Sequence, residues 1–540
     1  MKVAELLVKC LENESVSVVF GLPGEENLDV MDAIEESTSI RFVQTRHEQG
    51  AAFMADVYGR LTGEAGVCLS TLGPGATNLL TGVADAHLDH SPMVVLTGQV
   101  DLESLHKESH QHIDLVEMFR PVTKWNTQIV HSSTVSESVR KAFKVAQTEK
   151  TGPTHLDLPE DVAGRWTDDL PLPVNRPRAT VPAERDIERA LKVISKARYP
   201  LIIAGNGVVR GRASGMLTRF AEAFQIPVAH TFMGKGAVSY RNPLSLSSIG
   251  TQAWDSVSCG VDRADVVIAV GYDLVEFAPK YWNPDRAKEI IHIDTEPAEV
   301  DAYYNVKVGL TGGILESLDR LTKNAFHRTP PRIAGIRGMI LDELDSYREN
   351  KEFPLKPQKI ISDIRTVMGD DDIVISDVGA HKMWIARMYP CVKPNTCIIS
   401  NGFAAMGIAL PGALAAKLLF PEKKILAVVG DGGFMMNSQE LETAIRVGTP
   451  FVTLIFRDDH YGLIRLKQLD RFKRTSHVDF LNPDFVRYAE SFGAKGYRVE
   501  AADELTAILE DAFRQNVPSV IDCPVDYSPS KNPERIFCPI

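Results

Sequence analysis

The sequence predicts an α/β protein made of doubly wound parallel sheets in three domains. Its length of 540 residues corresponds to three or four domains at a typical ~150 residues each. Short apolar runs rich in valine and isoleucine alternate with amphipathic stretches. Uninterrupted apolar runs are typical of strands buried on both faces, and helical segments between such strands indicate parallel pairing. Proline-rich segments divide the chain into three parts.

The predicted strands coincide with the apolar runs. They cover residues 16–20, 40–43, 67–70, 93–97, 201–204, 266–270, 290–293, 373–376, 425–429, 451–456 and 519–521. Prolines cluster between residues 171 and 182 and again between 330 and 357, as expected of linkers. We therefore expect domains at 1–170, 183–330 and 358–528, followed by a C-terminal tail at 529–540.

The composition excludes several classes of protein. With 44% hydrophobic and 24% charged residues, the chain has the balance of a globular protein and not of a disordered one. Its net charge of −12 disfavours nucleic acid and anionic membrane surfaces as partners. The longest run without a charged or strongly polar side chain, 402–416, is shorter than the ~20 residues that span a bilayer. Glu5 and Lys9 interrupt any apolar leader, so we expect a cytoplasmic protein without a membrane partner.

A glycine-rich turn follows one predicted strand in the last domain. The run 425–429 leads into Gly430, Asp431, Gly432 and Gly433, and helical sequence follows. Glycines there allow backbone N–H groups to approach a phosphate at a helix N-terminus. An aspartate in that turn would repel the phosphate unless a cation lay between them, and Mg²⁺ binds carboxylate and phosphate oxygens.

A second aspartate supports a metal site. Asp458 follows the next predicted strand, 27 positions after Asp431. Because neighbouring parallel strands end side by side, both carboxylates can reach one metal. Either motif alone indicates no more than a turn, but their joint spacing favours a metal–diphosphate site.

These motifs resemble those of known thiamine diphosphate enzymes. Gly430-Asp431-Gly432 with Asp458 is similar to their metal and diphosphate signature. Residues 46–60 read RHEQGAAFMADVYGR, and residues 73–78 read GPGATN; both resemble segments of the acetolactate synthases. The chain thus resembles the thiamine diphosphate-dependent acetolactate synthase family from about residue 3 to residue 527, and is most similar to the catabolic, FAD-independent members.

The resemblance implies an activity and a role for each domain. Residues 1–170 would bind the pyrimidine, 183–330 would form a central Rossmann-like domain, and 358–528 would bind the diphosphate and Mg²⁺. The implied reaction is the decarboxylating condensation of two pyruvate molecules into 2-acetolactate and CO₂ through a thiamine diphosphate enamine. Family architecture implies a homodimer at minimum, and beyond that a homotetramer, because the first and last domains meet across a subunit interface.

The resemblance also implies the site residues. Glu48 follows a predicted strand and opens a helix; alone it would indicate only a solvent-exposed helix start, but in this context it would activate the aminopyrimidine by sharing a proton. The implied catalytic residues are Glu48, His110 and Gln111. The implied metal ligands are Asp431, Asp458 and the main-chain carbonyl of His460. The implied cofactor-binding residues are Glu48, Gly73, Asn78, Gly379, Ala380, His381, Ala404, Met406, Gly430, Asp431, Gly432, Gly433 and Tyr461.

Two positions bear on cofactor and substrate. The segment 272–276, YDLVE, resembles the flavin-free enzymes, so FAD is not expected. Lys467 stands where the anabolic enzymes carry a tryptophan that favours 2-oxobutyrate, which favours pyruvate as the acceptor. However, Glu25 and Glu26 stand where the catabolic enzymes have a lysine, which leaves the acceptor open. The alternatives are another thiamine diphosphate 2-oxoacid decarboxylase or carboligase, such as a sulfoacetaldehyde acetyltransferase, and a non-catalytic binding subunit of the same fold.

Overall fold

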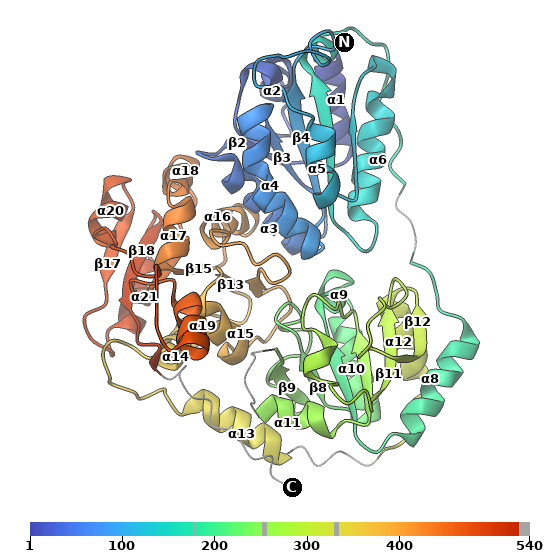
Figure 1. Cartoon of the computed structure of the whole chain (residues 1–540), viewed down its shortest axis with the longest axis vertical. Helices are drawn as coiled ribbons and strands as arrows, with labels where there is room; N and C mark the ends of the chain where they lie inside the picture. The colour runs from blue at the N-terminus through green and yellow to red at the C-terminus, as the bar shows by residue number, and fades with distance from the viewer. Residues whose placement is uncertain (176–178, 251–255, 329–333, 529–540) are drawn as a thin grey trace.

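The computed structural model describes residues 1–175, 179–250, 256–328 and 334–528, so the expected tail at 529–540 lies outside the described residues. Three six-stranded sheets are present in this part of the chain, and all their strand pairs are parallel. Each sheet lies in its own lobe with helices around it (Figure 1). The predicted α/β class with three doubly wound sheets is confirmed.

The N-terminal unit carries the first sheet, with strand order β2-β1-β3-β4-β6-β5. Its strands are β1 (Val18–Gly21), β2 (Arg41–Gln44), β3 (Gly66–Ser70), β4 (Met93–Gln99), β5 (Trp125–Gln128) and β6 (Pro153–Pro159). Its helices are α1 (Val3–Asn13), α2 (Leu28–Glu35), α3 (Glu48–Thr62), α4 (Gly73–Leu88), α5 (Leu115–Phe119), α6 (Val135–Gln147) and α7 (Glu160–Ala163).

The central unit carries the second sheet, with strand order β12-β11-β10-β7-β8-β9, which is the Rossmann order. Its strands are β7 (Pro200–Ala204), β8 (Val228–His230), β9 (Ser245–Ser248), β10 (Val266–Val270), β11 (Glu289–Asp294) and β12 (Val306–Thr311). Its helices are α8 (Glu184–Lys196), α9 (Asn206–Arg210), α10 (Ser214–Phe224), α11 (Ser256–Arg263) and α12 (Ile314–Lys323). Helix α13 (Ala334–Asp345) follows and leads to the last unit.

The C-terminal unit has strand order β14-β13-β15-β16-β18-β17, the same connectivity as the N-terminal unit. Its strands are β13 (Ile373–Ser376), β14 (Cys397–Ile399), β15 (Ile425–Gly430), β16 (Val452–Arg457), β17 (Lys495–Arg498) and β18 (Ser519–Pro524). Its helices are α14 (Pro357–Val367), α15 (Ala380–Met388), α16 (Ala409–Leu419), α17 (Asp431–Asn437), α18 (Glu440–Val447), α19 (Gly462–Phe472), α20 (Phe485–Ser491) and α21 (Leu505–Ala512).

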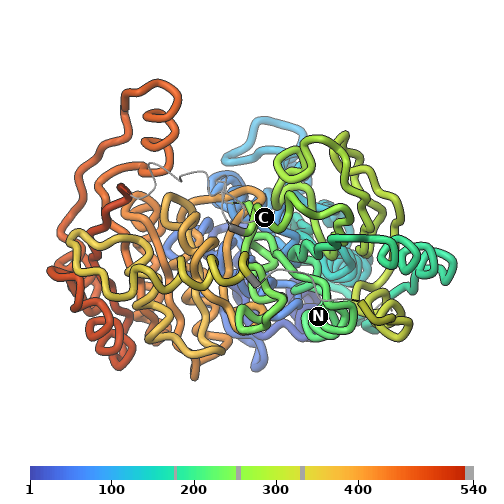
Figure 2. The backbone as a smooth tube through the Cα atoms, turned by 90° about the horizontal axis from the view of Figure 1, so that it is seen from below, coloured from blue at the N-terminus to red at the C-terminus, as the bar shows by residue number. Residues whose placement is uncertain are grey.

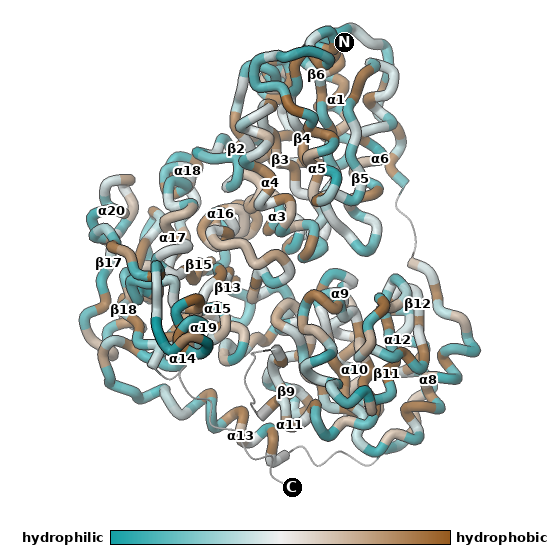
Figure 3. Tube along the Cα trace, in the orientation of Figure 1, coloured by the Kyte–Doolittle hydropathy of each residue, from teal (hydrophilic) through white to brown (hydrophobic). Residues whose placement is uncertain are grey.

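The N-terminal and C-terminal units share one hydrophobic core. Side chains of α3, α4 and α16 form a continuous buried cluster with the strands of both sheets. Small residues allow this packing: a Cβ on Gly82 would lie 2.5 Å from Cβ of Ala52, and one on Gly412 would lie 2.8 Å from Cγ2 of Val57. Figure 3 shows α16 as a mostly apolar segment between the two units. This packing fixes the two units relative to each other within one chain.

The arrangement of the three units is clearest from below. In that view the C-terminal and central units lie side by side in front of the N-terminal unit (Figure 2). Among the described residues, no helix combines the length and apolar character that crossing a bilayer requires. The expected domain limits at 1–170, 183–330 and 358–528 stay predictions.

Candidate functional site

A cavity of about 120 Å³ opens at the carboxyl ends of β13, β15 and β16. In this strand order the connections leave the sheet in opposite directions after β13 and β15, and such switch points are where open α/β sheets bind ligands. The predicted residues among its lining are Gly379, Ala380, His381, Met406, Gly430, Asp431, Gly432, Gly433, Asp458, His460 and Tyr461. Segments from 379 to 461 thus meet in one place.

Two carboxylates face this cavity from neighbouring strand ends. Asp431 is the first residue of α17, and Asp458 follows β16, which pairs with β15. Asp431 Oδ1 accepts from the N–H of Gly432 at 2.9 Å, and its Oδ2 accepts from the N–H of Asp459 at 2.7 Å. Burial, followed by repulsion from Asp431, raises the pKa of Asp458 to about 7. A buried carboxylate and a partly buried one that repel each other are an arrangement that a divalent cation between them would stabilise.

The glycines form a cradle with no room for side chains. A Cβ on Gly432 would lie 2.9 Å from Cε1 of Tyr461, and one on Gly433 would lie 3.1 Å from Oδ1 of Asp377. His381 is 1% exposed, and its Nε2 has no hydrogen-bond partner among the described residues. Burial lowers the pKa of His381 to about 3, so the imidazole is neutral. An unpartnered ring nitrogen beside the glycine turn that opens α17 fits a diphosphate.

The described residues alone do not fill the coordination shell of a metal ion. In the described part of the chain, no three His, Cys, Asp or Glu side chains converge into a closed metal site. Mg²⁺ commonly binds one or two carboxylates and completes its shell with phosphate oxygens and water. The carbonyl of His460, the third expected ligand, accepts a hydrogen bond from the N–H of Gly462 at 2.9 Å. The donor set therefore suits Mg²⁺ only in the presence of a diphosphate.

Asp377 is a site residue that the sequence interpretation missed. It follows β13, is fully buried, and its carboxylate accepts from the N–H groups of Gly407 and Ala409 at 2.9 and 3.3 Å. Burial raises the pKa of Asp377 to about 6. It fixes the backbone next to Met406. The signal was available, because Asp377 follows a predicted strand just as Asp431 does.

The predicted residues of the N-terminal unit gather separately. Glu48 is the first residue of α3 and is 8% exposed, and its Oε2 accepts from Nδ2 of Asn78 on α4 at 2.9 Å. Gly73 begins α4 with a φ of +47°, and a Cβ there would lie 2.6 Å from the carbonyl oxygen of Gln111. Neighbouring elements thus bring together four predicted residues: Glu48, Gly73, Asn78 and Gln111. His110 lies next to Gln111 and is exposed.

The two groups do not meet within one chain. No described residue of the N-terminal unit lines the cavity of the C-terminal unit. Ala404, with a left-handed φ of +58°, also lies outside the lining, although Met406 two residues later is part of it. Apolar side chains beside the cavity are exposed, including Phe403 at 46% and Met435 and Met436 at 42%.

The corresponding switch point of the central unit is closely packed, although Asn206 on α9 also lines a separate cavity of about 180 Å³ between the units. At the switch point between β7 and β10, a Cβ on Gly205 would lie 2.3 Å from the carbonyl oxygen of Gly271. The buried carboxylate of Glu276 accepts from the N–H of Asn206 at 3.1 Å and from Oγ1 of Thr231 at 2.5 Å. The side chain of Glu276 therefore already accepts the backbone N–H of Asn206, the first residue of α9.

Comparison with protein families matches three models in chain order. Residues 1–118 match the thiamine pyrophosphate enzyme N-terminal TPP binding domain, and residues 187–321 match the central domain of the same enzymes. Residues 377–523 match their C-terminal TPP binding domain. The cavity lies within the last of these regions.

Curated relatives align over nearly the whole chain. An acetolactate synthase of Bacillus subtilis is 35% identical over 98% of this chain and 94% of its own length. A catabolic acetolactate synthase of Raoultella terrigena is 34% identical over 97% of this chain and 95% of its own length. A probable acetolactate synthase large subunit of Methanococcus aeolicus is 36% identical over 98% of this chain and 92% of its own length.

Proposed function

The chain belongs to the acetolactate synthase family of thiamine pyrophosphate (thiamine diphosphate) enzymes, and on that premise we propose that it condenses two pyruvate molecules into 2-acetolactate and CO₂. The observation that carries the proposal is the convergence of Asp431, Asp458, the glycine cradle and His381 on one cavity at a switch point of the C-terminal sheet. This arrangement has the charge, backbone donors and space that a metal-bound diphosphate requires.

We propose that thiamine diphosphate is anchored there through Mg²⁺. Asp431, Asp458 and the carbonyl of His460 would hold the ion, while N–H groups of the cradle and Nε2 of His381 would contact the diphosphate. Ala404 would offer its carbonyl to the aminopyrimidine, and Met406 would support the bent cofactor. When bound, thiamine diphosphate supplies the carbon nucleophile and the electron sink for decarboxylation. The protein therefore has to bind, orient and desolvate more than it has to exchange protons.

Glu48 is proposed as the proton-sharing residue. Its carboxyl group is nearly buried, and Asn78 fixes one of its oxygens. The other oxygen lies beside Gly75, where a Cβ would be 3.4 Å from Oε1, in ordinary van der Waals contact. A positioned carboxyl group of this kind can hold a proton at a ring nitrogen. Gln111 and His110 are proposed to contact substrate from the neighbouring loop.

We propose a homodimer at minimum, assembled further into a homotetramer, in which Glu48 of one subunit serves the cavity of another. The support is that the cavity is lined without the N-terminal unit and is flanked by exposed apolar side chains. Exposed apolar groups that gather beside a site mark an interface.

We propose that the enzyme works without FAD. The support is the close packing at the central switch point: Glu276 accepts the backbone N–H of Asn206, and Lys150 forms ion pairs with Asp273 and Asp294 at the ends of β10 and β11. A dinucleotide would have to displace all of these groups.

The test is product analysis of the purified protein with pyruvate, thiamine diphosphate and Mg²⁺. We expect CO₂ and 2-acetolactate in equal amounts, the latter measured as acetoin after acid treatment. Acetaldehyde without acetolactate would instead indicate a simple decarboxylase. No turnover of any 2-oxoacid or sulfoacetaldehyde, despite tight cofactor binding, would indicate a binding subunit.

A further inference from the structure

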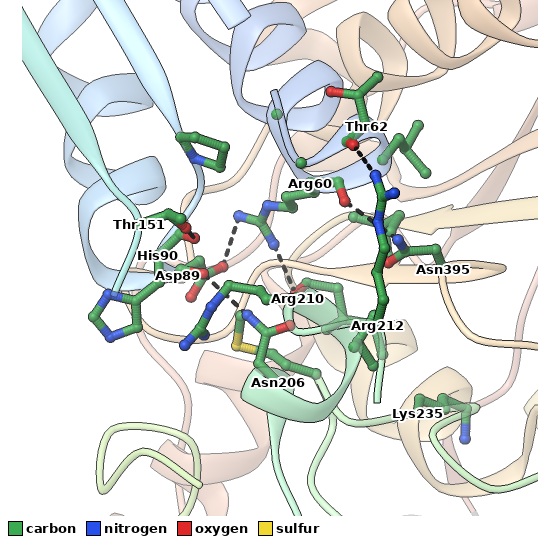
Figure 4. Close-up of a pocket in the computed structure, with 18 of the residues that line it drawn as sticks. Arg60, Thr62, Asp89, His90, Thr151, Asn206, Arg210, Arg212, Lys235 and Asn395 are labelled. Carbon is green, nitrogen blue, oxygen red and sulfur yellow. Dashed lines mark hydrogen bonds and ion pairs between the residues drawn. The ribbon is translucent and has the colours of Figure 1, made fainter. Parts of the chain in front are cut away.

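A buried charge cluster joins the N-terminal unit to a loop of the C-terminal unit. Arg60 on α3 forms an ion pair with Asp89 at 2.7 Å (Figure 4) and another with Asp85 at 3.0 Å, and both aspartates lie at the end of α4. The side chains of both aspartates are 0% exposed, and that of Arg60 is 8% exposed. We name Arg60, Asp85 and Asp89 the Arg60 clamp.

The Arg60 clamp holds the backbone of the segment 399–405. Asp89 accepts from the N–H of Gly402 at 2.6 Å and from the N–H of Asn401 at 3.1 Å. Asp85 accepts from Oγ of Ser400 at 2.6 Å and from the N–H of Ala405 at 3.2 Å. The contacts thus bracket Ala404 on both sides.

Further hydrogen bonds to other parts of the molecule hold the same segment. Arg60 Nη1 donates to the carbonyl of Ile399 at 3.2 Å, and Lys382, next to His381 on α15, donates to the carbonyl of Ser400 at 2.8 Å. The side chain of Asn401 reaches the central unit, where it donates to the carbonyl of Glu276 at 3.0 Å. These bonds satisfy backbone groups that form no helix or strand between β14 and α16.

The segment leads directly into the proposed cofactor site. Ala404 has a left-handed φ of +58°, which costs energy for a residue with a side chain and persists only where surrounding contacts enforce it. Met406, two residues later, lines the cavity. The clamp carboxylates are buried, charge-assisted acceptors, and such bonds are stronger than neutral ones, although Arg60 and Asp89 also line a cavity of about 180 Å³.

Resting on the proposed function, we propose that Asp85 and Asp89, with Arg60, are positioning residues that hold Ala404 and Met406 in the conformation that binds the aminopyrimidine side of thiamine diphosphate. They act through the backbone of 399–405 and do not touch the cofactor. Loss of one clamp carboxylate would release this segment before any chemistry takes place.

The experiment uses full-length Asp89→Asn and Asp85→Asn proteins. One measurement is the affinity for thiamine diphosphate with Mg²⁺, by calorimetry; the other is hydrogen–deuterium exchange of the cofactor-free proteins. We expect at least about 10-fold weaker binding, the lower end of what loss of a supporting group around a metal site causes, and faster exchange confined to peptides of 399–408. The milder Ser400→Ala variant, which removes one bond to Asp85, should shift both quantities in the same direction by less.

Asp363→Asn is the matched control. Asp363 is 5% exposed and pairs with Lys359 on α14 in the same unit, but it makes no hydrogen bond to 399–405 in the described structure. It should leave both measurements within twofold of the wild type. If Asp363→Asn weakens binding as much as Asp89→Asn does, the effect is general destabilisation and the proposal is overturned.

The remaining outcomes also decide the proposal. Unchanged exchange in 399–408, or changed exchange with unchanged affinity, would overturn it. If the Asp89→Asn or Asp85→Asn protein fails to fold, Ser400→Ala alone decides. If the clamp variants weaken binding of thiamine diphosphate as expected, but the wild-type protein makes no acetolactate, the clamp is supported and the proposed reaction is rejected.

Discussion

The C-terminal and central units differ at the same place in the fold, the switch point at the carboxyl ends of their strands. In both, glycine-containing turns follow strands on either side of a switch point. In the C-terminal unit this place is a cavity of about 120 Å³ with two aspartates at its wall. In the central unit Gly205 packs against Gly271, and Glu276 takes the backbone donor.

The difference shows that the fold supplies a location and the strand-end residues decide its use. In the C-terminal unit, the two aspartates lie at the wall of an open cavity, where a bound cation would stabilise their negative charge. In the central unit, the carboxylates of Asp273 and Asp294 already have a cation in Lys150. Substitutions in the two places should therefore have very different effects.

The largest effect is expected for Asp431→Ala. Removing this carboxylate takes away a proposed Mg²⁺ ligand, so Mg²⁺-dependent binding of thiamine diphosphate should weaken by more than about 100-fold, the upper end of the loss seen for groups that only support a metal ligand. Calorimetry with and without Mg²⁺ measures this. The control is Asp294→Asn at the end of β11, which should stay within twofold; equal losses in both variants would refute the contrast between the units.

Glu48→Gln should lower turnover and spare binding. The substitution keeps the hydrogen bond from Asn78 but removes the shared proton, so kcat should fall by about 10²-fold or more, as for loss of a positioned acid–base group. Steady-state kinetics with calorimetry separates the two quantities. Glu184→Gln, another helix-opening glutamate whose side chain is 59% exposed, should have no effect. A parallel loss of binding and turnover in Glu48→Gln would contradict the assigned role.

Mixing the two inactive variants tests whether the site is shared between subunits. Random heterodimers of Glu48→Gln and Asp431→Ala chains contain one site in which both residues are wild type, provided that the two come from different chains. Reassociated mixtures should therefore recover up to about a quarter of wild-type activity. No recovery, with heterodimers verified by mass spectrometry, would place Glu48 and Asp431 of the same chain in one site.

The smallest effect concerns stability in the central unit. Burial, followed by repulsion from Asp273, raises the pKa of Glu276 to about 8. The folded protein then holds this proton more tightly than the unfolded chain, so the associated stability is present below about pH 4.3 and is lost as pH rises through about 8. Glu276→Gln should therefore show a smaller fall in Tm between pH 5 and pH 9.

Differential scanning calorimetry at several pH values measures that fall. Glu289→Gln, whose side chain is 47% exposed on β11, is the control and should keep the wild-type pH dependence. An unchanged slope in Glu276→Gln would mean that Glu276 does not titrate as a buried acid in the folded protein.

The sequence predicted the longer apolar strands and missed seven that are short, polar or of mixed character, namely β5, β6, β8, β9, β12, β14 and β17. Each predicted run coincides with a strand, and 266–270 and 373–376 match in both bounds. The fully buried β6 was missed because His155 and Asp157 interrupt its apolar run. Both side chains bond to Thr97 on β4 at 2.8 Å, a compensation that periodicity cannot reveal. Strands β5 and β17 lie at sheet edges, carry polar sequences and were also missed.

The same limit applies to the site. The spacing of Asp431 and Asp458 predicted neighbouring carboxylates because strand ends are fixed by sheet connectivity. Asp377 was missed because it lies in no glycine-rich motif, although it follows a predicted strand. The Arg60 clamp depends on the packing of α3 and α4 against the segment 399–405, more than 300 positions away. Contacts at that separation follow from the fold and not from a local pattern.

The most direct test of the central claim is a crystal structure of the protein grown with thiamine diphosphate and Mn²⁺ in place of Mg²⁺, in which anomalous scattering locates the metal. We predict one metal ion per chain, bound by Asp431 and Asp458 and by the diphosphate over the cradle of Gly430–Gly433. A metal ion away from these two aspartates, or cofactor bound in the central crevice beside Glu276, would contradict the account.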